Sequence, residues 1–340
     1  MNIRAFILLA VLGIATPLST SAAPAPDVAL IAAAKREGTL TLYGSMTAPQ
    51  MQSLAQRFEM EYGIHVETLR LESNVIPSRM IIEARAGSPK ADVVDEPGFQ
   101  IDLLKRQQLL EKTARPENAE MTAGTFDRDG FWSSLFLNTE TIAYNPKLLA
   151  AAHVAPPKTW TDFTKPEWRG KFALFSGSYE WYAAMQKAFG KAQGEALARA
   201  LAANDAKLVN SHQQAENMLV AGEYMGALNT YGYNMAREQS AGSSAVNVNP
   251  TPTVIEVHGI GVAAKAPHPN AARLFLRWAL SRNTQTWVAT TLGRVSPRKD
   301  VKNNPAIWNS HIRYIVSDPA ESANYADYAK SFNAIFGVGG

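Results

Sequence analysis

Residues 156–178, PPKTWTDFTKPEWRGKFALFSGS, carry the clearest local signals in the chain. The Pro-Pro pair at the start predicts a turn, and Thr159 or Thr161 can cap a short helical turn that ends at Pro166. Residues 171–175 are mainly apolar and predict a short buried strand. An alanine-rich helical pattern begins directly after this strand.

The turn between this strand and this helix reads Ser176-Gly177-Ser178. Backbone N–H groups at the start of a helix, together with the two hydroxyls, would point at one spot and favour an anion there. An ordinary helix cap is the alternative interpretation. We therefore count Ser176, Gly177 and Ser178 among the candidate ligand-binding residues, together with Tyr179 behind them.

Helical and strand patterns alternate along the first hundred residues. Such alternation predicts a mostly parallel sheet flanked by helices, and ligands bind such sheets beyond the carboxyl ends of the strands. At these ends we predict ligand contacts from Tyr43, Ser45, Thr47 and Glu96. The expected strands are 39–43, 64–70 and 91–95, and the expected helices are 27–37, 49–62 and 75–86.

Two extended segments, residues 132–145 and 246–264, predict crossovers between two lobes. The expected fold class is α/β, in two lobes that each hold a mostly parallel sheet flanked by helices, with a hinged cleft between them. The predicted division is residues 27–135 and 253–300 for lobe 1, residues 136–252 for lobe 2, and residues 301–340 for a helical segment that packs across both lobes.

Residues 1–23 have the features of a cleaved signal peptide, because Arg4 precedes an apolar run and small residues follow it. The apolar run is too short to span a membrane, so we expect export to the periplasm. The chain has no cysteine, which excludes disulfides, thiolate metal sites and a lipid anchor on cysteine. A net charge of +3 over 340 residues gives no reason to expect nucleic acid or an anionic membrane as partner. We expect a monomer.

The sequence contains none of the GxSxG, HExxH and Walker A patterns, and its six histidines are scattered. We therefore predict a binding protein and not an enzyme, with no resident cofactor. His212 and His258 are the two histidines whose positions could bring them to the cleft.

Residues 159–174, TWTDFTKPEWRGKFAL, resemble a signature of bacterial extracellular solute-binding proteins. Residues 142–149, IAYNPKLL, and residues 266–285, within a helix expected at 269–289, resemble two further family signatures in the same order. The branch concerned serves ABC importers and includes ferric-iron receptors. The resemblance implies a type II periplasmic binding protein that captures a solute between its lobes and delivers it to an ABC permease. A sensory receptor on the same scaffold is the alternative.

The resemblance also implies a possible ferric site. Iron-binding members carry adjacent tyrosines in the loop that corresponds to residues 230–234, and an acidic residue at the end of the third strand. Tyr231 matches the first tyrosine, Gly232 stands at the second position, and Tyr233 follows it. Glu96, or Asp95, matches the acidic residue. Phenolate and carboxylate oxygens suit a hard ferric ion, so Tyr231, Tyr233 and Glu96 are the predicted iron ligands.

A small organic anion, such as a carboxylate or a phosphonate, is the second interpretation. Asn229, Tyr231 and Tyr233 would then form the pocket wall, and Arg79 or Arg298 would bind the anionic oxygens. A third interpretation places the tyrosines in the core as packing residues.

Overall fold

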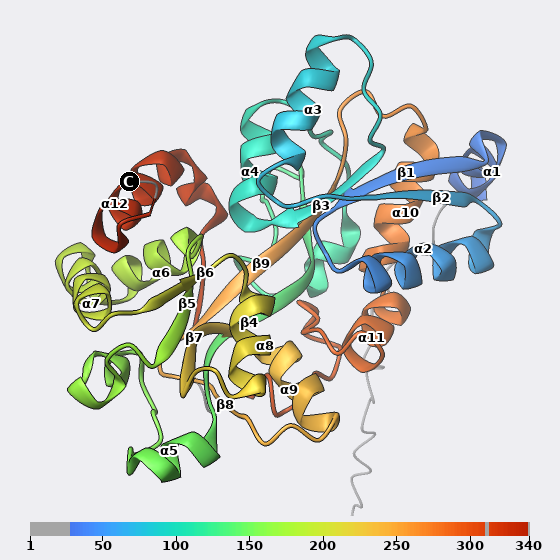
Figure 1. The fold of residues 1–340 in the computed structure, drawn as a ribbon. Coiled ribbons are helices and arrows are strands. Elements are labelled where there is room, and N and C mark those ends of the chain that lie inside the picture. Colours follow the sequence, from blue (N-terminus) through green and yellow to red (C-terminus); the bar gives the residue numbers. More distant parts are fainter. Residues whose placement is uncertain (1–27, 310–312, 339–340) are drawn as a thin grey trace, which may run out of the picture.

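The computed structural model describes residues 28–309 and 313–338. A ten-stranded sheet runs through the molecule in the order β2-β1-β3-β9-β4-β7-β5-β6, with β10 beside β9 and β8 beside β4. Helices gather around the two ends of this sheet and form two lobes (Figure 1). The predicted fold class, a two-lobed α/β protein, is therefore confirmed. The predicted signal peptide lies outside the described residues.

In lobe 1, β1 pairs in parallel with β2 and with β3. Phe58 on α2 packs against Phe275 and Trp278 on α10, with ring centroids 4.9 and 5.2 Å apart. These apolar contacts hold the amphipathic helices to the sheet. The elements of lobe 1 are β1 (Thr39–Gly44), β2 (His65–Arg70), β3 (Val93–Pro97), α1 (Val28–Glu37), α2 (Ala48–Tyr62), α3 (Ile76–Arg85), α4 (Gly98–Arg106), α10 (Pro269–Leu280) and α11 (Arg282–Thr290).

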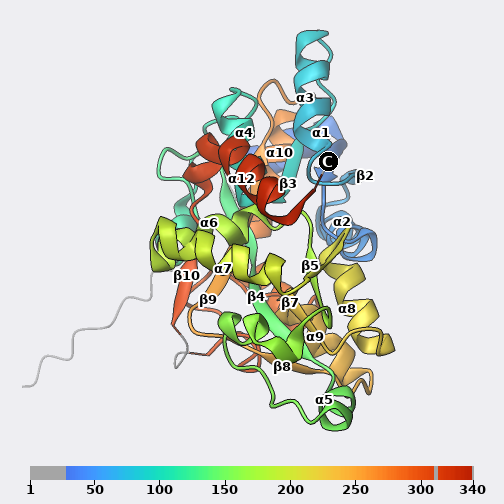
Figure 2. The ribbon, with the colours of Figure 1, turned by 60° about the vertical axis from the view of Figure 1, so that its left-hand side comes forward.

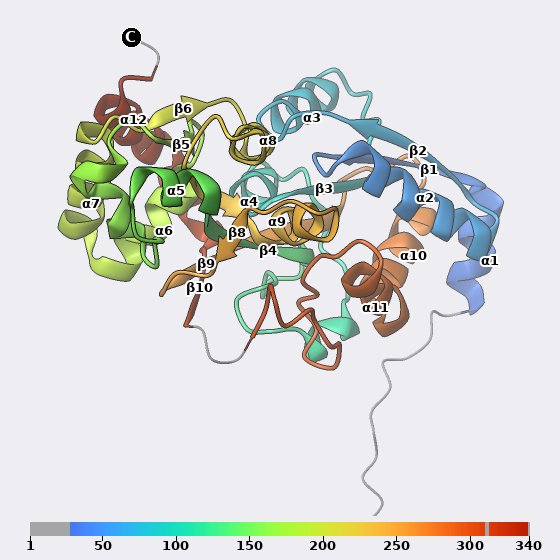
Figure 3. The same cartoon turned by 60° about the horizontal axis from the view of Figure 1, so that its bottom comes forward.

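In lobe 2, β5 pairs in parallel with β6 and with β7. Figure 3 shows α5, α6 and α7 of this lobe on the left, away from α1, α2 and α10, with α8 and α9 in the middle of the view. The elements of lobe 2 are β5 (Phe172–Phe175), β6 (Lys207–Val209), β7 (Gly226–Tyr231), β8 (Val246–Val248), α5 (Pro146–Ala152), α6 (Tyr179–Phe189), α7 (Lys191–Ala203), α8 (His212–Ala221) and α9 (Gly232–Ser240).

Two long antiparallel strands, β4 (Ser133–Tyr144) and β9 (Thr253–Val262), connect the lobes. One end of β9 pairs with β3 in lobe 1, whereas the far end of β4 pairs with β7 and β8 in lobe 2. The short β10 (Tyr314–Val316) lies beside β9. The register places Asn138 opposite Glu256 at the middle of the crossing.

The stretch at residues 156–178 builds part of the core of lobe 2. The carboxylate of Asp162 accepts hydrogen bonds of 2.8 Å from the backbone N–H groups of Lys158 and Thr159, which fixes the short helix η2 (Trp160–Thr164). The indole of Trp160 donates a 2.9 Å bond to the carbonyl of Pro252, just before β9. The stretch therefore ties lobe 2 to one of the crossovers.

The C-terminal segment contacts both lobes. The short helix η4 (Pro319–Asn324) packs on α4 of lobe 1, and α12 (Tyr325–Phe336) packs on α6 and α7 of lobe 2. Figure 2 shows α12 lying over α6. The remaining short helices are η1 (Pro116–Glu120) and η3 (Pro166–Trp168). Within the two described ranges, no helix has the length and apolar character needed to cross a membrane.

Two local predictions were wrong. The helix expected at 269–289 is two helices, because Ser281 adopts an extended backbone and its side chain caps α11 by accepting from the N–H of Thr284. The loop expected at 230–234 does not exist either. Strand β7 continues to Tyr231, and α9 begins at once with Gly232.

Candidate ligand-binding cleft

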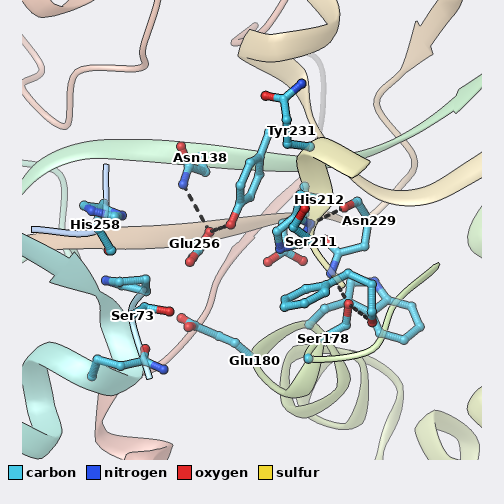
Figure 4. Close-up of a pocket in the computed structure, with 18 of the residues that line it drawn as sticks. Ser73, Asn138, Ser178, Glu180, Ser211, His212, Asn229, Tyr231, Glu256 and His258 are labelled. Atoms are coloured by element: carbon cyan, nitrogen blue, oxygen red, sulfur yellow. Dashed lines mark hydrogen bonds between the residues drawn. The ribbon is translucent and has the colours of Figure 1, made fainter. Parts of the chain in front are cut away.

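A cavity of about 240 Å³ lies between the lobes. Its walls come from the segments that follow β1, β2 and β3 in lobe 1, and from the starts of α6, α8 and α9 in lobe 2. The crossing strands β4 and β9 contribute Asn138, Glu140, Glu256 and His258. Parallel strands thus direct their carboxyl ends toward this cavity, as the sheet architecture predicts. Figure 4 shows a close-up of the site.

Carboxyl groups from both crossing strands line the cavity. Glu256 accepts hydrogen bonds from the Nδ2 atom of Asn138 at 3.1 Å and from the phenol of Tyr231 at 2.6 Å. Glu140 is only 2% exposed, and its Oε2 atom has no hydrogen-bond partner within the described ranges. Burial, together with the charge of Glu256, raises the pKa of Glu140 well above its ordinary value.

A third carboxyl group, that of Glu180 on α6, reaches across from lobe 2. Its Oε1 atom accepts a 2.5 Å hydrogen bond from the hydroxyl of Ser317, and the backbone of Phe99 at the start of α4 also bonds to it. A Cβ atom at Gly98 would lie 2.9 Å from Oε1, so the glycine gives the carboxyl group room. Burial and nearby Glu256 raise the pKa of Glu180 to about 8.

Tyr231, at the end of β7, lies at the centre of the lobe 2 wall. Its ring packs against the imidazole of His212, with centroids 4.2 Å apart, and its backbone N–H donates a 2.8 Å bond to Glu216. The Nδ1 atom of His212 donates in turn to the carbonyl of Asn229 at 2.6 Å. Burial, and to a smaller extent the negative charge of Glu256, raises the pKa of Tyr231 well above its ordinary value. The phenol therefore keeps its proton.

Arg294 is the buried cation of the cleft. It is 4% exposed, and its guanidinium lies over the rings of Tyr233 and Phe136 at 3.4 and 4.3 Å from their centroids. The Nη1 atom donates to Asn138, and the Nε and Nη2 atoms donate to Gln50. Its hydrogen-bond partners in the described part of the chain are therefore neutral.

The structure brings eight of the twelve predicted binding residues to the cavity. They are Ser45, Thr47, Gly177, Ser178, Tyr179, Asn229, Tyr231 and Tyr233. The other four, Tyr43, Glu96, Ser176 and Arg298, are not among the residues that line it.

The four misplaced residues have identifiable roles elsewhere. Tyr43 faces the opposite side of β1, where its phenol donates a 2.9 Å bond to Glu83 and Arg79 lies over its ring. Arg298 is paired with Asp300 through two 2.8 Å bonds and also donates to the carbonyl of Leu280. Because its charge is already balanced, Arg298 cannot serve the cleft as predicted.

Glu96 and Ser176 are also held outside the cavity. Glu96 is fully buried beside Ser45, and burial, followed by Asp95, raises its pKa well above the ordinary value. The backbone N–H of Ser176 donates to Val209 of β6, so this residue continues the sheet.

The Ser-Gly-Ser turn does not form the anion site that we considered. The hydroxyl of Ser178 donates to the carbonyl of Phe175 and accepts from the Nδ2 atom of Asn229, both at 2.8 Å. The backbone N–H groups of Ser178 and Tyr179 bond to carbonyls within the same turn. The Ser178 side chain makes no capping hydrogen bond to the N–H groups of α6 either, so the alternative interpretation, an ordinary side-chain cap, is not what the structure shows.

Sequence reasoning missed the charged residues that dominate the cleft: Glu140, Glu180, Glu256 and Arg294. One signal could have found two of them. Glu140 and Glu256 each lie within an otherwise uncharged predicted crossover, and charged residues are seldom buried without a partner or a function. In residues 28–309 and 313–338, no three histidine, cysteine, aspartate or glutamate side chains come together closely enough to hold a metal ion.

Residues 53–313 match the family of bacterial extracellular solute-binding proteins. The chain belongs to this family. Among the relatives of this solute-binding protein is iron uptake protein A1 of Synechocystis, 24% identical over an alignment 298 residues long that covers 81% of this chain and 80% of the relative. The Fe(3+)-binding periplasmic protein of Serratia marcescens is 22% identical over 270 residues, or 76% of this chain and 78% of the relative.

Solved structures of periplasmic binding proteins share the two-lobed fold. Iron-bound HitA from Pseudomonas aeruginosa matches with a TM-score of 0.77 at 22% identity, over 87% of this solute-binding protein and 99% of HitA. AfuA from Actinobacillus pleuropneumoniae, with fructose-6-phosphate bound, matches with a TM-score of 0.80 at 18% identity, over 88% and 99% of the two chains. One fold therefore accommodates ligands as different as iron and a sugar phosphate.

Proposed function

We propose that this solute-binding protein captures a small, positively charged solute in the cleft between its lobes. The supporting observation is the set of carboxyl groups around the cavity. Glu140, Glu180 and Glu256 line it from three different elements, and Glu96 lies buried close by. A solute with positive charge would stabilise the ionised form of these groups, whereas an anion would disfavour it.

The empty and occupied clefts differ in protonation under this proposal. The raised pKa values of Glu140 and Glu180 keep both carboxyl groups largely protonated at neutral pH when the cleft is empty. A bound cation stabilises the ionised carboxylates and expels the protons. The cleft therefore exchanges protons for a cation without leaving a large uncompensated charge.

Iron is one cation that fits this class, and it appears in the names of the two relatives described above. The oxygen atoms of Tyr231, Glu140 and Glu256 have the hard character that a ferric ion prefers. Tyr233 also lines the cavity; its ring lies beneath the guanidinium of Arg294 and its centroid is 5.9 Å from that of Tyr231.

The organic anion interpretation rests on one observation. Arg294 is buried, lines the cavity and, among the described residues, donates its hydrogen bonds to the neutral side chains of Gln50 and Asn138. Its guanidinium is nevertheless occupied by Gln50 and Asn138, and the Ser178 hydroxyl is occupied as well. We therefore favour a cation over an anion as the solute.

Capture is followed by closure and delivery. We propose that the lobes rotate about β4 and β9, that the protein works in the periplasm after loss of residues 1–23, and that it passes its solute to an ABC permease in the inner membrane. If the protein is a sensory receptor instead, the same closure would present the solute-bound form to its partner. Either way the protein acts as a carrier or receptor, without catalysis.

Calorimetry on the protein freed of solute by unfolding and refolding tests the charge of the ligand. Ferric nitrilotriacetate, organic ammonium ions, carboxylates and phosphonates are titrated in turn. We expect binding only among cations, and a loss of at least tenfold in affinity in Glu140→Gln. Glu67→Gln, an exposed change on β2, is the matched control. Binding of a carboxylate or phosphonate that survives Glu140→Gln would refute the proposal.

A further inference from the structure

We infer, building on the proposed cation receptor, that the solute is an organic ammonium compound whose charged nitrogen binds at Glu140 and Glu180. Its carbon skeleton lies along the aromatic wall of lobe 2. The inference depends on three independent features of the cavity: its unpaired acceptors, its size and its rings.

Three buried carboxyl and amide oxygens that line the cavity and can accept a hydrogen bond have no donor. The Oε2 atom of Glu140 and the Oδ1 atoms of Asn229 and Asn234 lack hydrogen-bond partners within residues 28–309 and 313–338, although the residues are only 2%, 1% and 2% exposed. Buried acceptors without a donor are costly, so the missing donors are expected on the ligand. A protonated amine supplies such N–H donors together with the positive charge, as the side chain of lysine does.

The three carboxyl groups are not equivalent. Glu256 already accepts from Asn138 and Tyr231, so its role is to hold the tyrosine ring in place. Glu140 has an unpaired oxygen, and Glu180 extends into the cavity from the start of α6 (Figure 4). An ammonium group between Glu140 and Glu180 would join the crossing strand β4 to helix α6.

The cavity is too large for a bare ion. Its volume of about 240 Å³ is far larger than the ~10–15 Å³ of this measure that one water molecule needs. A single metal ion would fill little of this space, and the described residues contain no group of three histidine, cysteine, aspartate or glutamate side chains placed to hold one. An extended molecule would fill the cavity.

Aromatic rings provide a surface for the carbon skeleton. Phe175, His212 and Tyr231 form a row with centroids 4.6 and 4.2 Å apart, and all three line the cavity. Tyr179 and Tyr325 meet edge-on at 5.6 Å on another side. Aromatic faces attract ammonium groups electrostatically and cover the methylene groups next to them.

Paired ligands test the inference on the unaltered protein. Primary, diamino and quaternary ammonium ions are each compared by calorimetry with the alcohol of the same skeleton, for example 1,4-diaminobutane with 1,4-butanediol. We expect at least one ammonium ion to bind, and its alcohol to bind at least tenfold more weakly. A panel in which no ammonium ion binds would overturn the inference.

Variants locate the charged nitrogen. We expect Glu140→Gln and Glu180→Gln each to weaken the ammonium ion at least tenfold while leaving the weak binding of the alcohol unchanged. The exposed control Glu67→Gln should alter neither. If both glutamate variants bind the ammonium ion as the original protein does, the proposed position is wrong.

Ferric nitrilotriacetate distinguishes this inference from the broader proposal. If it binds with a visible phenolate-to-iron band that Tyr231→Phe removes, and no ammonium ion binds, the solute is a metal. The ammonium inference then fails while the cation receptor stands. If acetate or phosphate binds and neither class of cation does, both proposals fail.

Discussion

The phenol of Tyr231 donates a 2.6 Å hydrogen bond to Oε2 of Glu256. This bond joins the end of β7 in lobe 2 to the crossing strand β9, directly beside the cavity. The Tyr231 ring, which forms part of the pocket wall, is thus oriented by a buried carboxyl group.

Removal of this phenol should destabilise the empty protein. We expect Tyr231→Phe to lower the free energy of unfolding by about 1–3 kcal/mol, because buried Glu256 loses a donor. Urea unfolding measures the change. In a double-mutant cycle, Glu256→Gln should make the second substitution less costly, since the two side chains interact directly. Strictly additive effects would show that the bond contributes nothing.

Solute affinity should increase between pH 6 and pH 8. Binding of a cation expels protons from Glu140 and Glu180, whose pKa values are raised, the latter to about 8. Each proton released can change the affinity by up to about tenfold per pH unit. Calorimetry in two buffers with different ionisation enthalpies counts the protons. Glu180→Gln should reduce that count, and an affinity independent of pH would contradict the protonation scheme.

Stability of the empty protein should decrease as the pH rises from about 5 to 8. Glu216 is fully buried, and burial raises its pKa from 4.5 to about 8. The folded state therefore holds a proton that the unfolded chain has lost. The stabilisation is complete below pH 4.5 and declines above it, by up to about 1.4 kcal/mol per pH unit.

Glu216→Gln isolates this effect. A glutamine resembles the protonated acid, and the Oδ1 atom of Asn234 lacks a donor in the described structure, so a turned Asn234 amide can accept from the new side chain. We expect the variant to match the original protein near pH 5 and to be the more stable of the two at pH 8. Urea unfolding at both pH values provides the test. If the free energy of unfolding changes equally with pH in the variant and in the original protein, Glu216 is not the source of the pH dependence.

Gly232, which stands where the ferric interpretation required a tyrosine, should not tolerate a side chain. A Cβ atom there would lie 2.3 Å from the hydroxyl oxygen of Thr139. We expect Gly232→Ala to lower the free energy of unfolding by about 1–3 kcal/mol through overpacking. Thr139→Ala in the same chain should restore part of the loss. No recovery in the double variant would mean that the strain arises elsewhere.

Solute binding should make the molecule more compact. The crossovers β4 and β9 are the segments about which the lobes can rotate, and Glu180 already bonds to the start of α4 from the other lobe. Small-angle scattering should give a smaller radius of gyration with saturating solute than without it. Equal radii would argue against a hinge.

Local patterns sufficed for most elements of the fold. The strand predicted at 64–70 and the helix predicted at 49–62 agree with β2 and α2 to within one residue, because alternation, helical periodicity and the cap at Gly63 are carried by neighbours in the chain. The single helix expected at 269–289 failed because Ser281 can either continue a helix or cap the next one, and both patterns look alike in sequence.

For the candidate site, the chain by itself determined which strand ends would meet at the cleft, since parallel strands direct their carboxyl ends to one edge. It also determined the family, through the stretch at residues 156–178. Only the tertiary structure decided the charge of the cleft. Glu140, Glu180 and Glu256 are far apart in sequence. The antiparallel register of β4 and β9, with Asn138 opposite Glu256, brings Glu140 and Glu256 to the cavity, and the start of α6 adds Glu180. Side-chain electrostatics depends on distance in space, which no local pattern encodes.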